Sequence, residues 1–213
     1  MRLAHSQDCD ALRRPSPEEP WRVLVSGCLT GLSCGADGTD YGLGGCLEQL
    51  LCHAAVRAFA FCPEDHAIGT PRGVPDIYGG DGRAVLRGDA RILDQHGEDL
   101  TEAMIEGARA MLVFARANAV ELAVLTDMSG ACGSQVISLG SRFAKPRRFQ
   151  QGLGVAAALL DEAGVAVVAQ RDFQTLGRLQ QILEPGFEVD PEARDHHEHP
   201  WTVSYFGEPK PGP

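Results

Sequence analysis

Cysteine is the residue type in this chain whose placement points most clearly to chemistry. Cys28, Cys62 and Cys132 stand in the segments SGC, FCPE and SGACG, and each follows closely after an apolar run. Three thiolates can hold a zinc ion with a fourth ligand, or an iron–sulfur cluster that leaves one iron open. A thiol at such a place can also be a nucleophile, or simply a small side chain packed at a strand end. The residues alone leave these alternatives open.

Two polar residues lie at short offsets from the cysteines. Glu64 follows Cys62 by two positions, and Ser129 precedes Cys132 by three. A carboxylate and a hydroxyl near a metal or a thiol can serve as an acid–base pair. On local pattern alone, the commoner roles are a helix cap or a surface carboxylate for Glu64 and a turn or cap hydroxyl for Ser129.

The elements that must position these groups alternate between strands and helices. Apolar runs predict strands at residues 23–25, 56–61, 120–127 and 165–169. Helical spacing predicts helices at 46–55, 98–118, 155–160 and 172–183. This order predicts an α/β fold with three layers, a mostly parallel sheet with helices on both faces, which is Rossmann-like. Ligands in such folds bind beyond the carboxyl ends of the strands, where the three thiols would converge.

The rest of the chain divides by composition. The length of 213 residues favours one compact unit, and we expect an N-terminal extension at 1–20, a single domain at 21–185 and a polar, Pro-rich tail at 186–213. Residues 66–97 are rich in Gly, Pro and Asp, which predicts a loop layer with at most a short hairpin around RAVLRGDARIL. The tail segment DHHEH is expected to lie mostly at the surface.

Charge and hydropathy restrict the partners. The net charge of −10 and the lack of a Lys/Arg cluster argue against nucleic acid and favour a small molecule as the ligand. The first twenty residues have no apolar core of a signal peptide, and no apolar run reaches bilayer length, so no membrane partner is expected. We therefore predict a cytoplasmic protein, whose seven cysteines stay reduced.

Five segments in unbroken order carry a family resemblance. They are VLVSGCLTGLSC, FCPED with GTPRGVPDIYGG, GEDLTEAMIEGA, SGACGS and GLGVAAALLDEAGV. Together they span roughly residues 22 to 170, and the chain resembles the TudS-like thiouracil desulfidase family.

The resemblance implies a 4Fe-4S cluster held by Cys28, Cys62 and Cys132. It implies that an open iron takes the sulfur of a thiolated pyrimidine-like heterocycle, such as 2-thiouracil or a related thiobase or thionucleoside. Non-redox desulfuration would then give the oxo compound and sulfide. In this family pattern Glu64 and Ser129 are the catalytic acid–base pair.

Several positions depart from the family pattern. Gly35 and Ala36 replace an Arg-Tyr pair, Thr126 and Asp127 replace Lys-Glu, SGACG replaces SPSCG, and Ala156 replaces a threonine. The ligands are retained while the pocket wall has changed, so cluster binding is better supported than the identity of the substrate. Alternative functions are a zinc- or thiol-dependent hydrolase or sulfur-transfer enzyme, and a non-enzymatic iron–sulfur sensor or binding module.

Four other residues carry weaker signals. Asp37 in ADG and Arg72 in TPRG are candidate substrate-binding residues; Asp37 could equally belong to a turn, and Arg72 could equally pair with a nearby aspartate. Cys34 is close enough to Cys28 to be a substitute ligand or a site of oxidation. Gly154 in GLGV could present backbone N–H groups to an anion, although tight helix packing is the commoner role.

Overall fold

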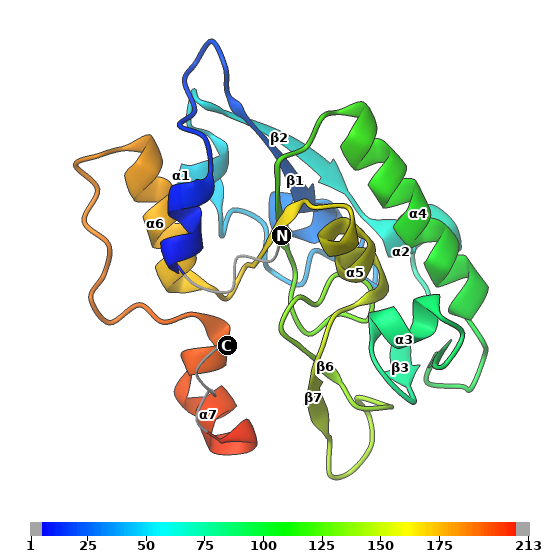
Figure 1. Cartoon of the computed structure of the whole chain (residues 1–213). Coiled ribbons are helices and arrows are strands. Elements are labelled where there is room, and N and C mark those ends of the chain that lie inside the picture. The colour runs from blue at the N-terminus through cyan, green and yellow to red at the C-terminus, as the bar shows by residue number, and fades with distance from the viewer. Residues whose placement is uncertain (1–5, 208–213) are drawn as a thin grey trace.

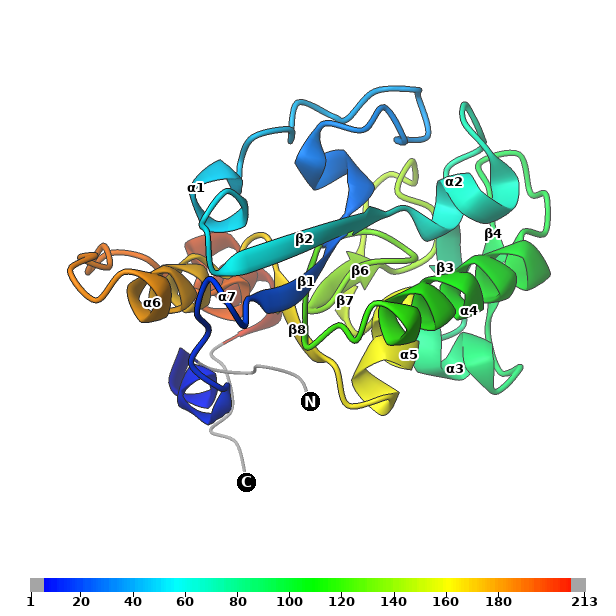
Figure 2. The same ribbon diagram turned by 90° about the horizontal axis from the view of Figure 1, so that it is seen from above.

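A parallel four-stranded sheet forms the centre of the computed structural model, which describes residues 6–207. The strand order is β2-β1-β5-β8, with bounds β1 (Trp21–Ser26), β2 (Val56–Phe61), β5 (Leu122–Leu125) and β8 (Ala166–Ala169). The β1–β2 register runs from Trp21 opposite Val56 to Ser26 opposite Phe61. Helices cover both faces of the sheet (Figures 1 and 2), which confirms the predicted three-layer α/β fold.

Alternating side chains of the strands face two separate cores. Leu24, Ala123, Leu125 and Val167 point into one core, while their strand neighbours point into the other. Because successive residues of a strand point to opposite faces, continuous apolar runs are what a sheet buried on both sides requires. This is why the strands could be recognised in the sequence.

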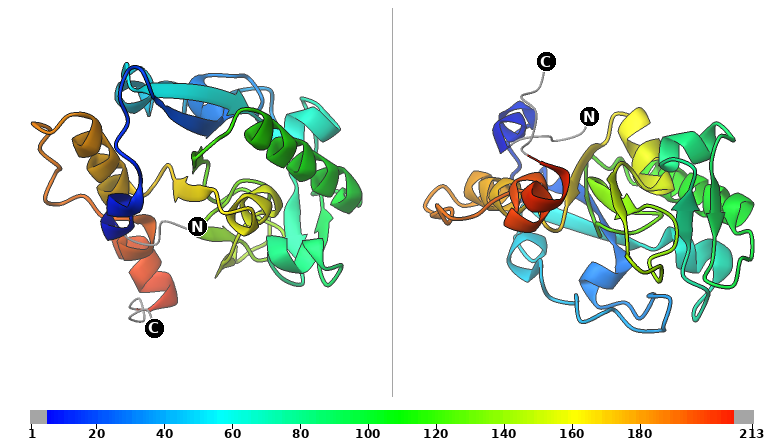
Figure 3. Two further views of the ribbon diagram at one scale, coloured as in Figure 1. Left: turned by 45° about the horizontal axis from the view of Figure 1, so that its top comes forward. Right: turned by 90° about the horizontal axis from the view of Figure 1, so that it is seen from below.

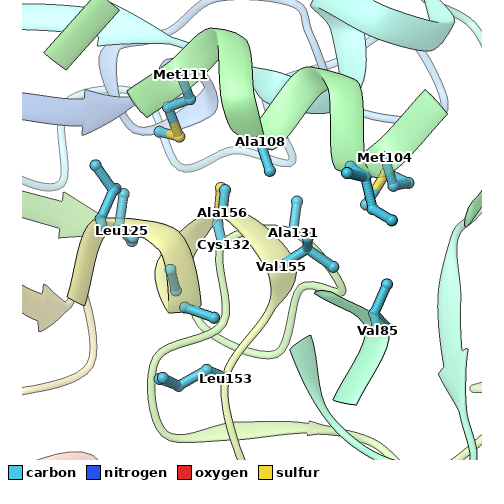
Figure 4. Close-up of a cluster of buried hydrophobic side chains, with 14 of the residues drawn as sticks. Val85, Met104, Ala108, Met111, Leu125, Ala131, Cys132, Leu153, Val155 and Ala156 are labelled. Carbon is cyan, nitrogen blue, oxygen red and sulfur yellow. The ribbon is translucent and has the colours of Figure 1, made fainter. Parts of the chain in front are cut away.

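Helices α4 (Thr101–Ala117) and α5 (Val155–Glu162) cover the first face. Met104, Ala108 and Met111 form one stripe of α4, and Figure 4 shows them facing Val155 and Ala156 of α5 across the core. Burying a side chain of this size contributes about 1.5 to 3 kcal/mol. The stripe therefore anchors both helices on the sheet.

The second face is covered by three short helical segments and one longer helix: η1 (Ser6–Ala11), η2 (Gly27–Thr30), α1 (Glu48–Leu51) and α6 (Phe173–Leu183). Trp21, Leu29 and Leu179 are fully buried in this core. Helix α1 has four residues, fewer than the helix predicted at 46–55, because Gly45 adopts a positive φ before it and β2 starts at Val56. Figure 3 shows α6 and η1 side by side on this face, where Arg178 of α6 pairs with Asp10 of η1.

The segment predicted as a loop layer contains short regular elements. They are α2 (Pro63–Ile68), β3 (Asp76–Tyr78), α3 (Gly82–Leu86) and β4 (Arg91–Leu93). The stretch RAVLRGDARIL lies partly in α3 and partly in β4, and β4 pairs antiparallel with β3. The predicted hairpin is wrong because the side chain of Asp81 accepts a hydrogen bond from the N–H of Ala84 and starts a helix there. A second hairpin that was not predicted joins β6 (Val136–Ser138) and β7 (Phe149–Gln151).

The C-terminal segment packs against the domain through η3 (His196–Glu198) and α7 (Pro200–Phe206). Asp195 and His196 are 2% and 1% exposed, so the expectation that DHHEH lies at the surface is wrong for these two residues. Trp201 of α7 stacks edge-on against Phe149 of β7, with ring centroids 4.9 Å apart. Within residues 6–207, no helix combines the length and apolar character needed to span a bilayer.

Candidate active site

The three cysteines lie beyond the carboxyl ends of three adjacent strands. Cys28 follows β1 in η2, Cys62 follows β2 directly, and Cys132 lies in the turn after β5. All three line one cavity of about 500 Å³, together with Glu64 and Ser129. The structure thus brings together residues that are spread over more than a hundred positions of the sequence, from Cys28 to Cys132.

A fourth thiol shares this site. Cys34 is buried and hydrogen-bonds to both Cys28 and Cys62. These bonds lower the pKa of Cys28 to about 7 and also lower the pKa of Cys62, against the opposing effect of burial. The same contacts, together with burial, raise the pKa of Cys34, because its single proton is shared between the two neighbouring sulfurs. The thiol of Cys62 in turn donates to the carbonyl oxygen of Cys34 over 3.7 Å, so Cys28, Cys34 and Cys62 form one interacting group in the cavity wall.

Neighbouring polar groups add to this effect. The Oγ1 atom of Thr126 lies 3.0 Å from the Sγ of Cys28. The N–H of Asp65, in the first turn of α2, donates to the Sγ of Cys62 over 3.4 Å. Cys62 is the residue that caps this helix, so its sulfur faces the positive end of the helix dipole.

Cys132 has a different environment. It is 6% exposed and lies in the apolar core beside Ala131 and Ala156 (Figure 4), and burial raises the pKa of its thiol. Its turn is fixed by the start of α5, where the N–H groups of Val155 and Ala156 donate to the carbonyl oxygens of Gly130 and Ala131. Such a thiol loses its proton when a metal binds, since the metal charge replaces it.

The glycine before α5 serves close packing. A Cβ on Gly154 would lie 2.5 Å from the carbonyl group of Ala131, so only glycine allows this approach. The N–H of Gly154 donates to the carbonyl oxygen of Gly133 over 2.7 Å. The backbone donors of this helix start bind the Cys132 turn, which agrees with the packing role considered for GLGV.

Glu64, Ser129 and Arg72 form a connected set on the cavity wall. The Oγ of Ser129 donates to Oε1 of Glu64 over 3.1 Å, and Nη2 of Arg72 lies 2.7 Å from Oε2. Ser129 is itself oriented by the N–H groups of Ala131 and Cys132, which both donate to its Oγ over 3.1 Å. Although burial opposes the charge on Arg72, Glu64 outweighs it and raises the pKa of the guanidinium. Both oxygens of the carboxylate are thus held in a fixed orientation.

Arg72 uses its N–H donors within the protein. Besides Glu64, they bind the carbonyl oxygens of Cys34 and Gly69 and the hydroxyl of Thr70. An arginine has five such donors, and all are occupied here. The ion-pair partner of Arg72 is therefore Glu64 and not an aspartate. These contacts leave no N–H group of Arg72 to bind a substrate.

Asp37 lies outside the cavity. Its Oδ1 accepts hydrogen bonds from the backbone N–H and the hydroxyl of Thr39, which is the pattern of an Asx turn. The residue is exposed, so the structure does not bring it together with Glu64 and the cysteines.

The altered pocket wall has a physical explanation at residue 35. A Cβ on Gly35 would lie 2.5 Å from the carbonyl oxygen of Thr39 and 2.7 Å from the ring of Tyr41. The hydroxyl of Tyr41 accepts a hydrogen bond from the N–H of Ala36 over 2.6 Å. Tyr41 therefore fills the space beside residues 35 and 36 and lines the cavity together with them.

Three further arginines were missed in the sequence because they are spread over two loops. Arg142 and Arg147 come from the β6–β7 hairpin, and Arg171 follows β8; all three line the cavity. Arg142 is paired with Asp76, with Nε 2.9 Å from Oδ1. Arg147 and Arg171 have no carboxylate partner among residues 6–207.

Comparison with known proteins identifies the family. A family model described as 2-thiouracil desulfurase matches residues 23–172. The chain belongs to the 2-thiouracil desulfurase family. The uncharacterized protein YbbK of Bacillus subtilis (strain 168) is 34% identical over 155 residues, which cover 72% of this chain and 99% of YbbK. The match to the family model confirms the resemblance stated from the sequence motifs and supports an enzymatic function.

A solved structure agrees with the family assignment. The protein described as the 4Fe-4S-dependent thiouracil desulfidase TudS aligns with 70% of this chain and 90% of its own length. Its TM-score is 0.56 and its sequence identity is 30%. The match to the family model ends at residue 172, so the segment that follows lies outside it.

The residues present fit an iron–sulfur cluster by their chemistry. Thiolates are the ligands that such clusters take, and the cavity offers Cys28, Cys62 and Cys132 at one mostly buried wall. Among residues 6–207, no three His, Cys, Asp or Glu side chains lie together as ligands of a single metal ion. In a four-iron cluster each cysteine binds a different iron, so its ligands need not meet at one point.

Proposed function

We propose that this protein removes sulfur from a thiolated pyrimidine-like heterocycle, such as 2-thiouracil or a related thiobase or thionucleoside. The reaction replaces C=S by C=O and consumes one water, so that sulfide leaves and no electrons are exchanged. The observation that carries this proposal is the convergence of three cysteines with a hydrogen-bonded Glu64 and Ser129 in one cavity. Membership in the 2-thiouracil desulfurase family supports it.

Cys28, Cys62 and Cys132 would hold a 4Fe-4S cluster, the cofactor named for TudS. When bound, the cluster supplies an open iron, a thiophilic Lewis acid that binds the thiocarbonyl sulfur and polarises the C=S bond. Cys34 is placed to hydrogen-bond to the ligand sulfurs, as it does to Cys28 and Cys62. We assign it to this supporting role, although its position also suits a substitute ligand.

Glu64 acts as the base in the proposed reaction. Its Oε1 takes a proton from the water that adds to the ring carbon, while Arg72 holds Oε2 and keeps the carboxylate aimed at the cavity. General-base assistance of this kind commonly contributes about a hundredfold to ten-thousandfold in rate. Ser129, which now donates to Oε1, would release this bond and donate to the reacting group as the proton moves.

Substrate binding falls to the remaining cavity wall. The Tyr41 ring offers an aromatic surface for a heterocycle. Arg147 and Arg171 supply donors for oxygen atoms of the substrate, since Arg72 has none to spare. The earlier assignment of Arg72 and Asp37 to the substrate is replaced in this proposal by the positioning of Glu64 and by a turn.

The test is anaerobic purification and reconstitution of the full chain. The wild type should hold about four irons and four sulfides per chain, as a 4Fe-4S cluster requires, and should release sulfide from 2-thiouracil. Glu64→Gln should keep the iron and lose at least about a hundredfold in rate. Cys62→Ala should lose the iron, whereas Cys52→Ala, which changes an exposed cysteine away from the cavity, should keep both iron and activity. A colourless wild type without iron or sulfide release would overturn the proposal.

The same experiment separates the alternative functions. Stoichiometric zinc in place of iron would favour a zinc-dependent hydrolase, and activity without any metal would favour a thiol-dependent enzyme. A wild type that holds a stable cluster but shows no turnover would favour a sensor or binding module. In that case Glu64→Gln should leave the cluster content unchanged.

A further inference from the structure

A buried contact between a histidine and a carboxylate connects the C-terminal segment to the wall of the active-site cavity. Nδ1 of His196 lies 2.5 Å from Oδ2 of Asp127, and both side chains are at most 1% exposed. Asp127 lines the cavity, two positions before Ser129. His196 belongs to η3, beyond residue 172, where the match to the 2-thiouracil desulfurase family ends. A segment outside the family match thus contacts the active-site wall directly.

Asp127 closes the base of the loop that carries Ser129 and Cys132. Its Oδ1 accepts hydrogen bonds from three backbone N–H groups at the far end of the loop, those of Ser134, Gln135 and Val136, over 2.9 to 3.2 Å. The N–H of Asp127 itself donates to Oε1 of Gln170. Asp127 stands at the start of the loop and its carboxylate binds the end of the loop. The orientation of this carboxylate therefore fixes the conformation of residues 128–133.

The loop between these ends holds a strained conformation. Met128, directly before Ser129, has φ of +61°, a value that non-glycine residues seldom adopt. Strain of this kind persists only where the surroundings fix it, and it costs of order 1 to 3 kcal/mol. The hydrogen bonds gathered by Asp127 are the contacts placed to hold it.

His196 is in turn fixed from several sides. Its N–H donates to Oδ1 of Asp172 over 3.0 Å, and its ring stacks on Trp201 with ring centroids 6.1 Å apart. Asp172 also accepts a hydrogen bond from the side chain of Gln135, which brings the network back to the loop. The imidazole is therefore a rigid donor to Asp127 and not a mobile surface group.

We propose that the C-terminal segment is an integral part of the active site, in which His196 is a positioning residue that fixes Ser129 and Cys132 through Asp127. The inference rests on the proposed function for the roles of Ser129 and Cys132. His196 does not touch the substrate. It orients the Asp127 carboxylate, and this carboxylate binds both ends of the loop. The loop in turn places the Ser129 hydroxyl against Glu64 and the Cys132 sulfur in the cavity.

The test compares three variants of the full chain, prepared anaerobically like the wild type. His196→Ala removes the donor, and His196→Asn keeps a side-chain N–H near the position of Nδ1. Arg194→Ala is the matched control, because Arg194 lies in the same segment, donates to the carbonyl oxygens of Pro191 and Ala193, and its side-chain hydrogen bonds and ion pair involve neither His196 nor Asp127. Two readouts are taken: kcat and KM for sulfide release from 2-thiouracil, and hydrogen exchange of peptides from residues 127–136 and from β1.

For His196→Ala we expect faster exchange in residues 127–136 with unchanged protection of β1, because a local opening does not expose the sheet. We expect kcat to fall about tenfold to a hundredfold with KM nearly constant, the size of effect that a displacement of about 1 Å produces. His196→Asn should restore most of both, and Arg194→Ala should match the wild type.

Equal loop exchange and equal kcat in His196→Ala and Arg194→Ala would overturn the proposal. So would exchange that rises equally in β1 and in the loop, since that indicates a role in global stability alone. If His196→Ala does not fold, His196→Asn decides: a folded Asn variant as slow as Glu64→Gln would refute the positioning role. A wild type that releases no sulfide refutes the proposed function instead, while loop exchange still tests the role of His196.

Discussion

The ion pair between Glu64 and Arg72 makes a quantitative prediction about how the site is held. Arg72→Met keeps most of the aliphatic stem and removes the guanidinium. The Arg72 side chain is 3% exposed and that of Glu64 is 13% exposed, so the carboxylate would be left in the cavity wall without its cation. The carbonyl oxygens of Cys34 and Gly69 would lose a donor as well.

The size of the effect follows from burial. Removing one partner of a buried ion pair costs about 3 to 5 kcal/mol in the free energy of unfolding. Because Glu64 still reaches the cavity, we take the lower value, about 3 kcal/mol. With a urea dependence of about 2 to 3 kcal/mol per molar, the midpoint of unfolding should fall by about 1 to 1.5 M.

A double-mutant cycle isolates the contribution of the charge. The four proteins are the wild type, Arg72→Met, Glu64→Gln and the double variant, and their urea midpoints are measured anaerobically by circular dichroism. In the Glu64→Gln background no carboxylate is left unpaired, so Arg72→Met should cost about 1 to 3 kcal/mol less there. An equal shift in both backgrounds would refute the reasoning, since it would mean that Arg72 acts only through its bonds to the carbonyl groups.

Two further predictions concern stability. Burial raises the pKa of Asp172 from 3.8 to about 6, so the folded protein binds this proton more tightly than the unfolded chain. Its stabilising contribution, about 3 kcal/mol at most, is full below about pH 4 and is lost as the pH rises through 6. Asp172→Asn should remove this decline from urea midpoints measured between about pH 4 and 6.5, and an identical decline in the variant would contradict the assignment. Gly35→Ala should lower the free energy of unfolding by about 1 to 3 kcal/mol, because the added Cβ would clash with Thr39 and Tyr41. Thermal unfolding measures the loss, and Gly186→Ala is the control, because a Cβ at residue 186 would enter open space.

The sheet and the convergence of the cysteines could be predicted because both follow from local pattern and topology. Buried parallel strands are continuous apolar runs, and their carboxyl ends meet at one edge of the sheet. The residue after each run is therefore placed without knowledge of the loops. Cys28 and Cys62 follow their strands so closely that little else was needed.

The rest of the site depends on contacts that leave no periodic signal. The elements of residues 63–93 are three to six residues long, too short to be recognised by spacing, and tertiary contacts hold them in place. Cys34 lies in an irregular loop, and nothing in the sequence shows that it reaches both Cys28 and Cys62. His196 and Asp127 are separated by 69 positions, and the histidine lies in a stretch whose polar composition is typical of a surface tail.

These unpredicted contacts explain why the sheet alone does not make the site. The functional residues beyond the strand ends are held in place by contacts with elements outside the sheet. Gly107 lets α4 approach Pro63 and so fixes the start of α2, which carries Glu64. The Cys132 turn is fixed by the start of α5, and the Ser129 loop is fixed by Asp127. A change in any of these supports should alter the geometry of the site while leaving the sheet intact, so function and stability should respond separately to substitutions in this protein.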